Sequence, residues 1–387
     1  MIKSAKFEIA MITLLGILAY GIQIPFLGFF QDDWNFVYYY SLNGTQGLLE
    51  LMTIDGRPGG VWIYALGFSL FGFKPALWQL FSIFFRILTA ISAFLILKRL
   101  LPERRNGNLI ASIFFLVYPF FTLQPLSVSF AQHYVGYFLL GCSLLLTIQA
   151  IEQPNKFLLY TIPAVVFTLA HLFNVEYFVG LELLRPILIW YFISRGNGAP
   201  WTKRLGKTAL IWLPYFLVLV FFVLWRSLFL ASLGIRNNPL NALTDSGEIV
   251  LSVIQYAPAD LALMLGSSWS ALINPDLFVI GPIRNLYIAL SAAVTTIGFY
   301  YFSRGKYLSA EDKSTTLRVF MVGGLIIAAG MIPAYSIGYI LNNKLPPWNS
   351  RFSLPALLGL ALVISEFITI IITSLKVRHF FLSSCWV

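Results

Sequence analysis

The chain has 387 residues, of which 58% are hydrophobic and only 11% are charged, and its mean hydropathy is +0.80. Soluble domains carry about a quarter of charged residues, so this composition excludes a soluble globular protein and predicts a polytopic membrane protein. The formal charge of +10 would suggest nucleic acid in a soluble protein, but no DNA or RNA motif accompanies it and no nucleic-acid partner is expected. Cys142 and Cys385 match neither a disulfide framework nor a metal-binding spacing.

Apolar runs of helical length predict an all-α integral membrane fold with about ten transmembrane helices. The first run, preceded by Lys3 and Lys6, is longer than a signal-peptide core and indicates a retained signal anchor. The shorter runs at 59–72 and 249–274 are bounded or broken by Gly and Pro, and we expect interfacial or re-entrant helices there. The predicted spans are 7–29, 75–97, 108–122, 134–152, 157–173, 177–193, 207–228, 277–302, 318–341 and 352–374.

The basic residues predict the orientation of these spans. Most of the 26 lysines and arginines fall in loops that an alternating topology places in the cytoplasm, together with both chain ends. Segments 30–74, 229–276 and 342–351 are then extracytoplasmic, and 229–276 forms an outer loop or re-entrant segment. We find no internal repeat or separable soluble part, so residues 1–387 read as a single polytopic membrane domain. The ending 379–387 fits both a natural tail and a truncated reading frame.

An acid pair, Asp32 and Asp33, directly follows the first span and is placed on the extracytoplasmic side. Neighbouring side chains diverge by about 100° on a helix, so both carboxylates cannot address one substrate atom. We expect one acid to bind or deprotonate a substrate and the other to anchor the loop or a cation. The alternative is that both cap the helix that follows and stay solvated.

Further candidate binding residues lie at the same predicted face. Arg57 precedes Pro58 in a glycine-rich turn, where its planar fork could grip a phosphate or anchor the chain to lipid headgroups. His133 and Glu176 lie at outer span ends, where each could instead be an ordinary interfacial or helix-terminal residue. Arg236 and Arg351 belong to the later outer segments.

Four charged residues fall inside predicted spans, where each would cost about 2.5–3.5 kcal/mol if unpaired near the centre. Glu182 and Arg185 lie three residues apart on one helix face and are expected to pair. Arg86 could close the same network, and Glu366 is also expected to avoid lipid.

A first outer loop that opens with an acid pair and passes through an Arg-Pro turn into an interfacial helix resembles the GT-C superfamily of polytopic glycosyltransferases. This superfamily includes the protein O-mannosyltransferases and the aminoarabinose transferase of lipid A. The stretches NVEYFVGLELLRP at 174–186 and NSRFSLP at 349–355 are similar to its bacterial members. The resemblance covers most of the chain in layout and rests on short motifs, among which the acid pair is the most specific.

The resemblance implies transfer of a sugar from a polyprenyl-phosphate donor to an extracytoplasmic lipid, glycan or protein acceptor, with inversion at the anomeric carbon, in the plasma (inner) membrane. It makes Asp32 the catalytic base and Asp33 the second acid of the catalytic pair. Arg57, Arg236 or Arg351 would neutralise the leaving lipid phosphate. No cofactor is expected, and a divalent cation bridging the acids would find no further ligand set in the sequence.

One departure from the family pattern concerns the second outer loop. Many relatives carry another acid there, whereas residues 122–134 contain none. His133 or Glu176 would then substitute, or the catalytic pattern is incomplete.

Two other functions compete with this one. A transporter or flippase for a lipid-linked or amphipathic solute would explain the charges at membrane depth, although the repeated halves and broken midplane helices typical of transporters are not evident. A non-enzymatic envelope scaffold would leave the acid pair facing bulk water with no pocket behind it.

Overall fold

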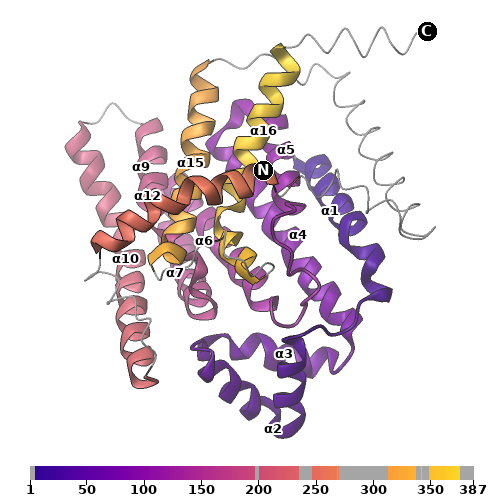
Figure 1. Ribbon diagram of the computed structural model, residues 1–387. Helices are drawn as coiled ribbons and strands as arrows, with labels where there is room; N and C mark the ends of the chain where they lie inside the picture. Colours follow the sequence, from indigo (N-terminus) through magenta and orange to yellow (C-terminus); the bar gives the residue numbers. More distant parts are fainter. Residues whose placement is uncertain are drawn as a thin grey trace, which may run out of the picture.

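The computed structural model describes residues 5–196, 200–234, 246–267, 269, 313–336, 341 and 348–374. All regular secondary structure in these ranges is helical (Figure 1). The elements in chain order are α1 (Lys6–Tyr20), η2 (Gly21–Phe26), α2 (Asp33–Ile54), η3 (Pro58–Gly60), α3 (Val61–Phe71), α4 (Pro75–Leu100), η4 (Pro102–Arg104), α5 (Arg105–Leu116), α6 (Ala131–Glu152), η5 (Pro154–Lys156), α7 (Phe157–Asn174), η6 (Glu176–Phe178), α8 (Val179–Glu182), α9 (Arg185–Gly196), α10 (Trp201–Ser232), α12 (Ser246–Ala262), η7 (Leu263–Ser267), α15 (Lys313–Ser336), η10 (Trp348–Ala356) and α16 (Leu357–Ser374).

Within the described part of the chain, 8 helical segments are long and apolar enough to cross a membrane. Each coincides with a predicted span, so the expectation of an all-α, multi-pass membrane protein is confirmed at this level. The predicted span 277–302 lies outside the described residues. The 8 segments are Lys6–Phe26, Pro75–Leu100, Ala131–Glu152, Pro154–Asn174, Glu176–Arg195, Trp201–Ser232, Ser314–Ser336 and Trp348–Ile371.

The predicted span 108–122 differs from the structure. Helix α5 ends at Leu116, and the residues that follow form turns and irregular backbone as far as residue 130. We call this stretch the 117–130 segment. Pro119 has no N–H to continue a helix, and it disfavours the helical conformation of Tyr118 before it. The apolar run therefore supplies a short helix followed by an irregular segment.

The loop 30–74, which is predicted to be extracytoplasmic, is built mainly from two helices. α2 and α3 lie side by side at one end of the bundle, at the bottom of Figure 1, and stacked pairs such as Phe36 with Tyr64 join them. Inside α2 the chain kinks at Asn43 and Gly44, and the φ of 57° at Gly44 is one that a residue without Cβ adopts easily. The short apolar helix expected at 59–72 is present as η3 and α3.

The broken run at 249–274 is described in part. α12 contains Pro258 and passes into the π-helical turn η7. Residues 270–274 lie outside the described residues.

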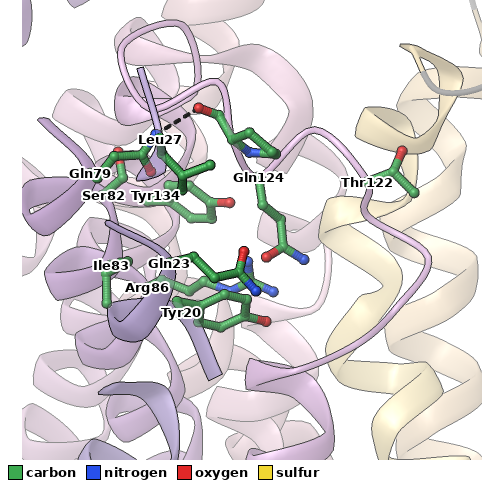
Figure 2. A pocket seen from close by; sticks show the side chains of 11 residues that line it. Tyr20, Gln23, Leu27, Gln79, Ser82, Ile83, Arg86, Thr122, Gln124 and Tyr134 are labelled. Carbon is green, nitrogen blue, oxygen red and sulfur yellow. Dashed lines mark hydrogen bonds between the residues drawn. The ribbon is translucent and has the colours of Figure 1, made fainter. Parts of the chain in front are cut away.

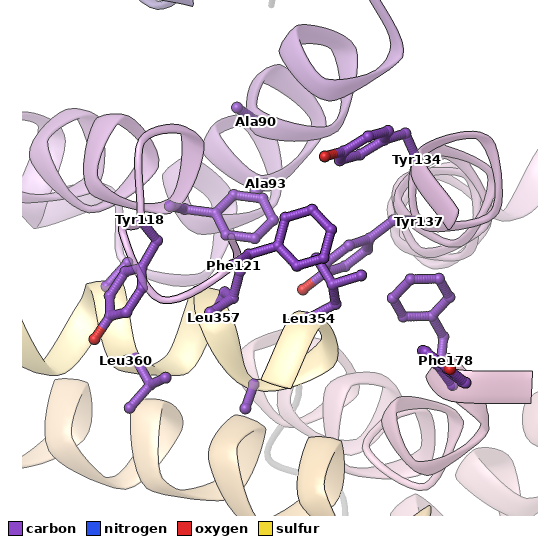
Figure 3. Packing of buried hydrophobic residues seen from close by; sticks show 14 of the residues in the cluster. Ala90, Ala93, Tyr118, Phe121, Tyr134, Tyr137, Phe178, Leu354, Leu357 and Leu360 are labelled. Atoms are coloured by element: carbon purple, nitrogen blue, oxygen red, sulfur yellow. The ribbon is translucent and has the colours of Figure 1, made fainter. Parts of the chain in front are cut away.

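The main core surrounds α6, which packs against α4 and α7. Figure 3 shows Tyr134 and Tyr137 of α6 facing Phe121 of the 117–130 segment, Phe178 of η6 and Leu354 of η10. Helices α8 and α15 approach each other so closely that a Cβ added to Gly180 would lie 1.9 Å from the carbonyl oxygen of Ala329. The core therefore joins segments that are far apart in the sequence at the same end of the bundle.

Ion pairs join elements at the opposite end. Arg104 pairs with Glu366, Arg105 pairs with Glu8, and Arg318 lies 3.2 Å from Glu103. The residues of all three pairs belong to loops or span ends that the topology assigns to the cytoplasm, apart from Glu366, which lies within α16. Glu366 is buried as expected.

The buried charges of α8 and α9 form a closed network. Arg185 donates two hydrogen bonds to Glu182, at 2.6 Å each, and others to hydroxyls of α6 and α7. His171 lies 2.8 Å from the same carboxylate. The expected Glu182–Arg185 pair is confirmed. The expectation that Arg86 joins it is wrong, because Arg86 instead donates to the carbonyl oxygen of Leu116 on α5.

Candidate functional site

The acid pair lies at the junction between η2 and α2, and its two members have different surroundings. Asp33 is fully buried as the first residue of α2. Its Oδ1 accepts hydrogen bonds from the Val128 N–H at 3.1 Å, the Ser129 N–H at 2.8 Å and the Ser129 hydroxyl at 2.9 Å. Burial raises the pKa of Asp33 to about 6, although these hydrogen bonds lower it. Asp33 therefore anchors the 117–130 segment to the start of α2.

Asp32, one residue earlier, is exposed. Its side chain makes no capping hydrogen bond to α2, and within the described ranges it has no ion pair. The preceding Gln31 has a φ of 40°, which is uncommon for a residue with a Cβ, whereas Asp32 itself has ordinary helical dihedral angles, so the backbone strain of the turn lies at Gln31. The expectation that both acids stay solvated as helix caps does not describe Asp33.

Arg57 and Glu176, separate candidates in the sequence, are partners. The Arg57 guanidinium donates to both carboxylate oxygens of Glu176, at 2.9 and 2.7 Å. Arg226 of α10 approaches the same carboxylate at 3.3 Å and donates to the Gly56 carbonyl oxygen at 2.9 Å. Glu176 thus ties the turn before η3 to η6 and α10, and most of the charge of Arg57 is already neutralised.

Asp55 is a member of the site that the sequence analysis did not single out. Its carboxyl is exposed, and desolvation by the surrounding protein raises its pKa. Arg57 and Arg351 oppose that rise, while Asp32 and Glu176 add to it. Because Asp55 senses all of these charges, the acid pair, the Arg-Pro turn and η10 belong to one charged cluster. The available sequence signal was the position of Asp55 two residues before Arg57.

His133 lies within the same region but is buried. Its ring packs between Phe130 and Tyr177, with centroid distances of 4.6 and 5.0 Å. Neither ring nitrogen has a hydrogen-bond partner among the described residues. Tyr177 also contacts Arg57, whose guanidinium lies 5.3 Å from its ring centroid.

Arg351 approaches this cluster from η10. Its guanidinium lies 4.9 Å from the ring of Phe352, which in turn packs 5.3 Å from Tyr177. The Nε of Arg351 is buried without a hydrogen-bond partner, and no ion pair of Arg351 is found in the described part of the chain. Arg351 is therefore the cation of this cluster whose charge is not matched by a contacting carboxylate there.

Two residues close to Gly60 carry further unpartnered polar atoms. Gln132 Oε1 and Asn174 Nδ2 are buried and lack hydrogen-bond partners among the described residues, although Asn174 Oδ1 accepts from Trp62 at 2.9 Å. Gly60 fits between these two residues, because an added Cβ would lie 2.9 Å from Gln132 Oε1. Such groups are normally satisfied by water or by a ligand.

Arg236 lies outside the described residues. The described ranges contain no group of three or more His, Cys, Asp or Glu side chains that could hold a metal ion.

The site therefore brings together Asp32, Asp33, Arg57, His133, Glu176 and Arg351 with Asp55, Arg226 and Tyr177, which the sequence did not single out. Comparison of this chain with protein-family models, with curated proteins and with solved structures finds no match.

Proposed function

We propose that this chain is a membrane-embedded glycosyltransferase that moves a sugar from a polyprenyl-phosphate donor to an extracytoplasmic acceptor with inversion. The observation that carries the proposal is that the two acids of the pair have different surroundings. Asp33 is held by hydrogen bonds from Val128, Ser129 and Phe30, whereas the neighbouring Asp32 presents an exposed carboxylate. The charge of Asp32 acts on Asp55, as do the charges of Arg57 and Arg351.

In this proposal Asp32 is the general base. It takes the proton of an acceptor hydroxyl as that oxygen forms a bond to the anomeric carbon from the face opposite the phosphate. The bond between the anomeric carbon and the phosphate oxygen breaks, and the leaving polyprenyl phosphate keeps the electron pair. A cation must then stabilise the added negative charge.

Arg351 is the best placed group for that charge. Arg57 and Arg226 share the single carboxylate of Glu176, so Arg57 holds the turn and the three groups together keep a net positive charge. Arg351 has no such carboxylate partner in the described part of the chain.

The test is transfer of radiolabelled sugar from a panel of polyprenyl-phosphate sugars by purified protein in lipid nanodiscs. General-base catalysis is worth ~10²–10⁴-fold in rate, so Asp32→Asn should lose transfer by that factor while remaining folded. Glu50→Gln, which neutralises another exposed acid of α2, is the matched control and should keep normal transfer.

Near-normal transfer by both Asp32→Asn and Asp33→Asn would overturn the assignment. An absence of turnover across the panel with folded protein would shift the weight to movement of a lipid-linked solute. The charges within the spans supported transport, but Glu182 and Arg185 neutralise each other and so need no transported solute to explain them.

A further inference from the structure

We propose that a pocket lined by Arg86 binds the phosphate group of a membrane lipid at a place separate from the acid-pair cluster. The pocket lies between the end of α1, η2, α4, the 117–130 segment and the start of α6, and its volume is about 210 Å³. Its polar lining comprises Tyr20, Gln23, Gln79, Ser82, Gln124 and Tyr134 in addition to Arg86.

The charge of Arg86 is the first observation. Three arginines are buried in the described part of the chain, and two of them, Arg104 and Arg185, each contact a carboxylate. Arg86 is only 8% exposed, yet within the described ranges it has no ion pair. A cation within a span that lacks a counter-ion indicates a ligand site, because burying it unpaired is costly.

The surroundings of the guanidinium are the second observation. Its Nε donates to the Leu116 carbonyl oxygen at 2.9 Å, and Arg86 also donates a hydrogen bond to Tyr134. A guanidinium has five N–H donors, so further donors are left for a ligand. The rings of Tyr20 and Tyr134 lie 4.1 and 5.8 Å from the guanidinium carbon. Figure 2 shows Gln23 beside Arg86 and Tyr20, with the Gln124 amide directed toward the same space. A planar, partly stacked guanidinium among amides suits an oxyanion.

The size and position of the pocket favour a lipid. Drug-sized ligands occupy about 300–1,000 Å³, so 210 Å³ suits a phosphate headgroup rather than a larger soluble molecule. Apolar side chains next to the lining residues are exposed, namely Ile22 and Phe26 on η2 and Leu80 and Phe84 on α4. Hydrocarbon chains attached to the phosphate can pack on that surface.

The pocket is separate from the acid-pair cluster but shares a wall with it. Gln79 and Ser82 donate to carbonyl oxygens of Pro125 and Ser127, whereas Asp33 accepts from Val128 and Ser129 of the same segment. The proposal does not depend on glycosyl transfer, because it assigns only binding.

The test is a thermal-shift titration of the purified full chain in neutral detergent with dioctanoyl phosphatidic acid. Dioctanoylglycerol, which lacks the phosphate, and inorganic phosphate are titrated in parallel. We expect saturable stabilisation by the phosphatidic acid, and at least tenfold weaker effects of the other two. Equal effects of dioctanoylglycerol would overturn the phosphate assignment, and equal effects of inorganic phosphate would overturn the lipid source.

Two variants locate the site. Arg86→Gln should weaken phosphatidic acid binding at least tenfold, whereas Arg99→Gln, which removes a cation from the far end of the same helix, should keep wild-type affinity. Gln23→Glu tests the site independently in case Arg86→Gln does not fold. Gln23 is exposed, so the change should be tolerated, and a carboxylate there would pair with Arg86 and exclude the phosphate. Wild-type affinity in a folded Gln23→Glu or Arg86→Gln protein would overturn the site.

Discussion

At the residue scale, the acid pair shows how adjacent carboxylates acquire different properties. Asp33 is enclosed by backbone and hydroxyl donors of the 117–130 segment, and Asp32 faces outward. The difference follows from helix geometry, because neighbouring side chains on a helix point in different directions. Burial raises the pKa of Asp33 to about 6.

This pKa predicts a pH dependence of stability. The pKa of Asp33 is about 6 in the folded state and has its ordinary value of 3.8 in the unfolded state, so the folded state binds the proton more tightly. The stability gained from protonated Asp33 is therefore fully present below pH 3.8 and is lost as the pH rises through about 6. The difference corresponds to ~3 kcal/mol. Thermal unfolding is measured in detergent at pH 4.5 and at pH 7, each on the order of one unit from the pKa of Asp33. The stability of the wild type should fall from the lower to the higher pH relative to the stability of Asp33→Asn.

The Asp33→Asn protein has no carboxyl at this position to titrate, so its stability should change less over the same range. Asp32→Asn is the control and should keep the wild-type slope, since it leaves the buried carboxyl in place. Parallel slopes for wild type and Asp33→Asn would contradict the assignment of this titration to Asp33.

At the element scale, irregular segments rather than long helices assemble the candidate site. The 117–130 segment is held by Asp33 on one side and by Gln79 and Ser82 on the other, and Thr122 lies 3.2 Å from Ser350 of η10 through their hydroxyls. η6 brings Glu176 and Tyr177 to the same end. The position of η6 in turn depends on the close packing of α8, which follows it, against α15.

Gly180 tests that packing. In Gly180→Ala the new Cβ would lie 1.9 Å from the Ala329 carbonyl oxygen, so α8 and α15 must separate, at a cost of about 1–3 kcal/mol. Thermal unfolding in detergent should show the loss. Gly324→Ala on α15 is the matched control, because nothing lies within 4 Å of its added Cβ and the change should be neutral or slightly stabilising. Equal stability of the two variants would show that the contact with Ala329 is not tight.

At the scale of the whole molecule, the described segments that the topology places outside gather at one end of the bundle. The acid pair, α3, the 117–130 segment, η6 and η10 meet there, whereas the pairs that involve Glu8, Glu103 and Arg105 join elements at the other end. This segregation agrees with alternating spans, and the orientation in the membrane stays a prediction of the positive-inside rule.

Cysteine labelling tests the orientation. In a background with Cys142→Ser and Cys385→Ser, a membrane-impermeant maleimide applied to intact cells should label Gln46→Cys on α2. It should label Asn155→Cys in η5 only after permeabilisation. Both positions are exposed, so accessibility depends on the side of the membrane rather than on burial. The reverse pattern would place the acid pair in the cytoplasm and would contradict an extracytoplasmic site.

The sequence by itself determined the class of the molecule. Whether a segment crosses a membrane depends on its own length and apolarity, since each span must satisfy its backbone internally, and these are local properties. The same local character identified the Glu182–Arg185 pair, three residues apart. It also identified the acid pair as distinctive, but it could not distinguish the surroundings of Asp32 from those of Asp33.

Only the tertiary structure decided which distant groups meet. Arg57 pairs with Glu176 across 119 residues, and Asp33 binds Ser129 across 96 residues. Arg86 lines a pocket instead of joining the α8–α9 network, and Pro119 ends a helix that apolarity alone would continue. Such pairings arise from the packing of α4, α6, α7, α15 and α16 around one another, and neither hydropathy nor residue spacing encodes that packing, because both describe a segment without its neighbours.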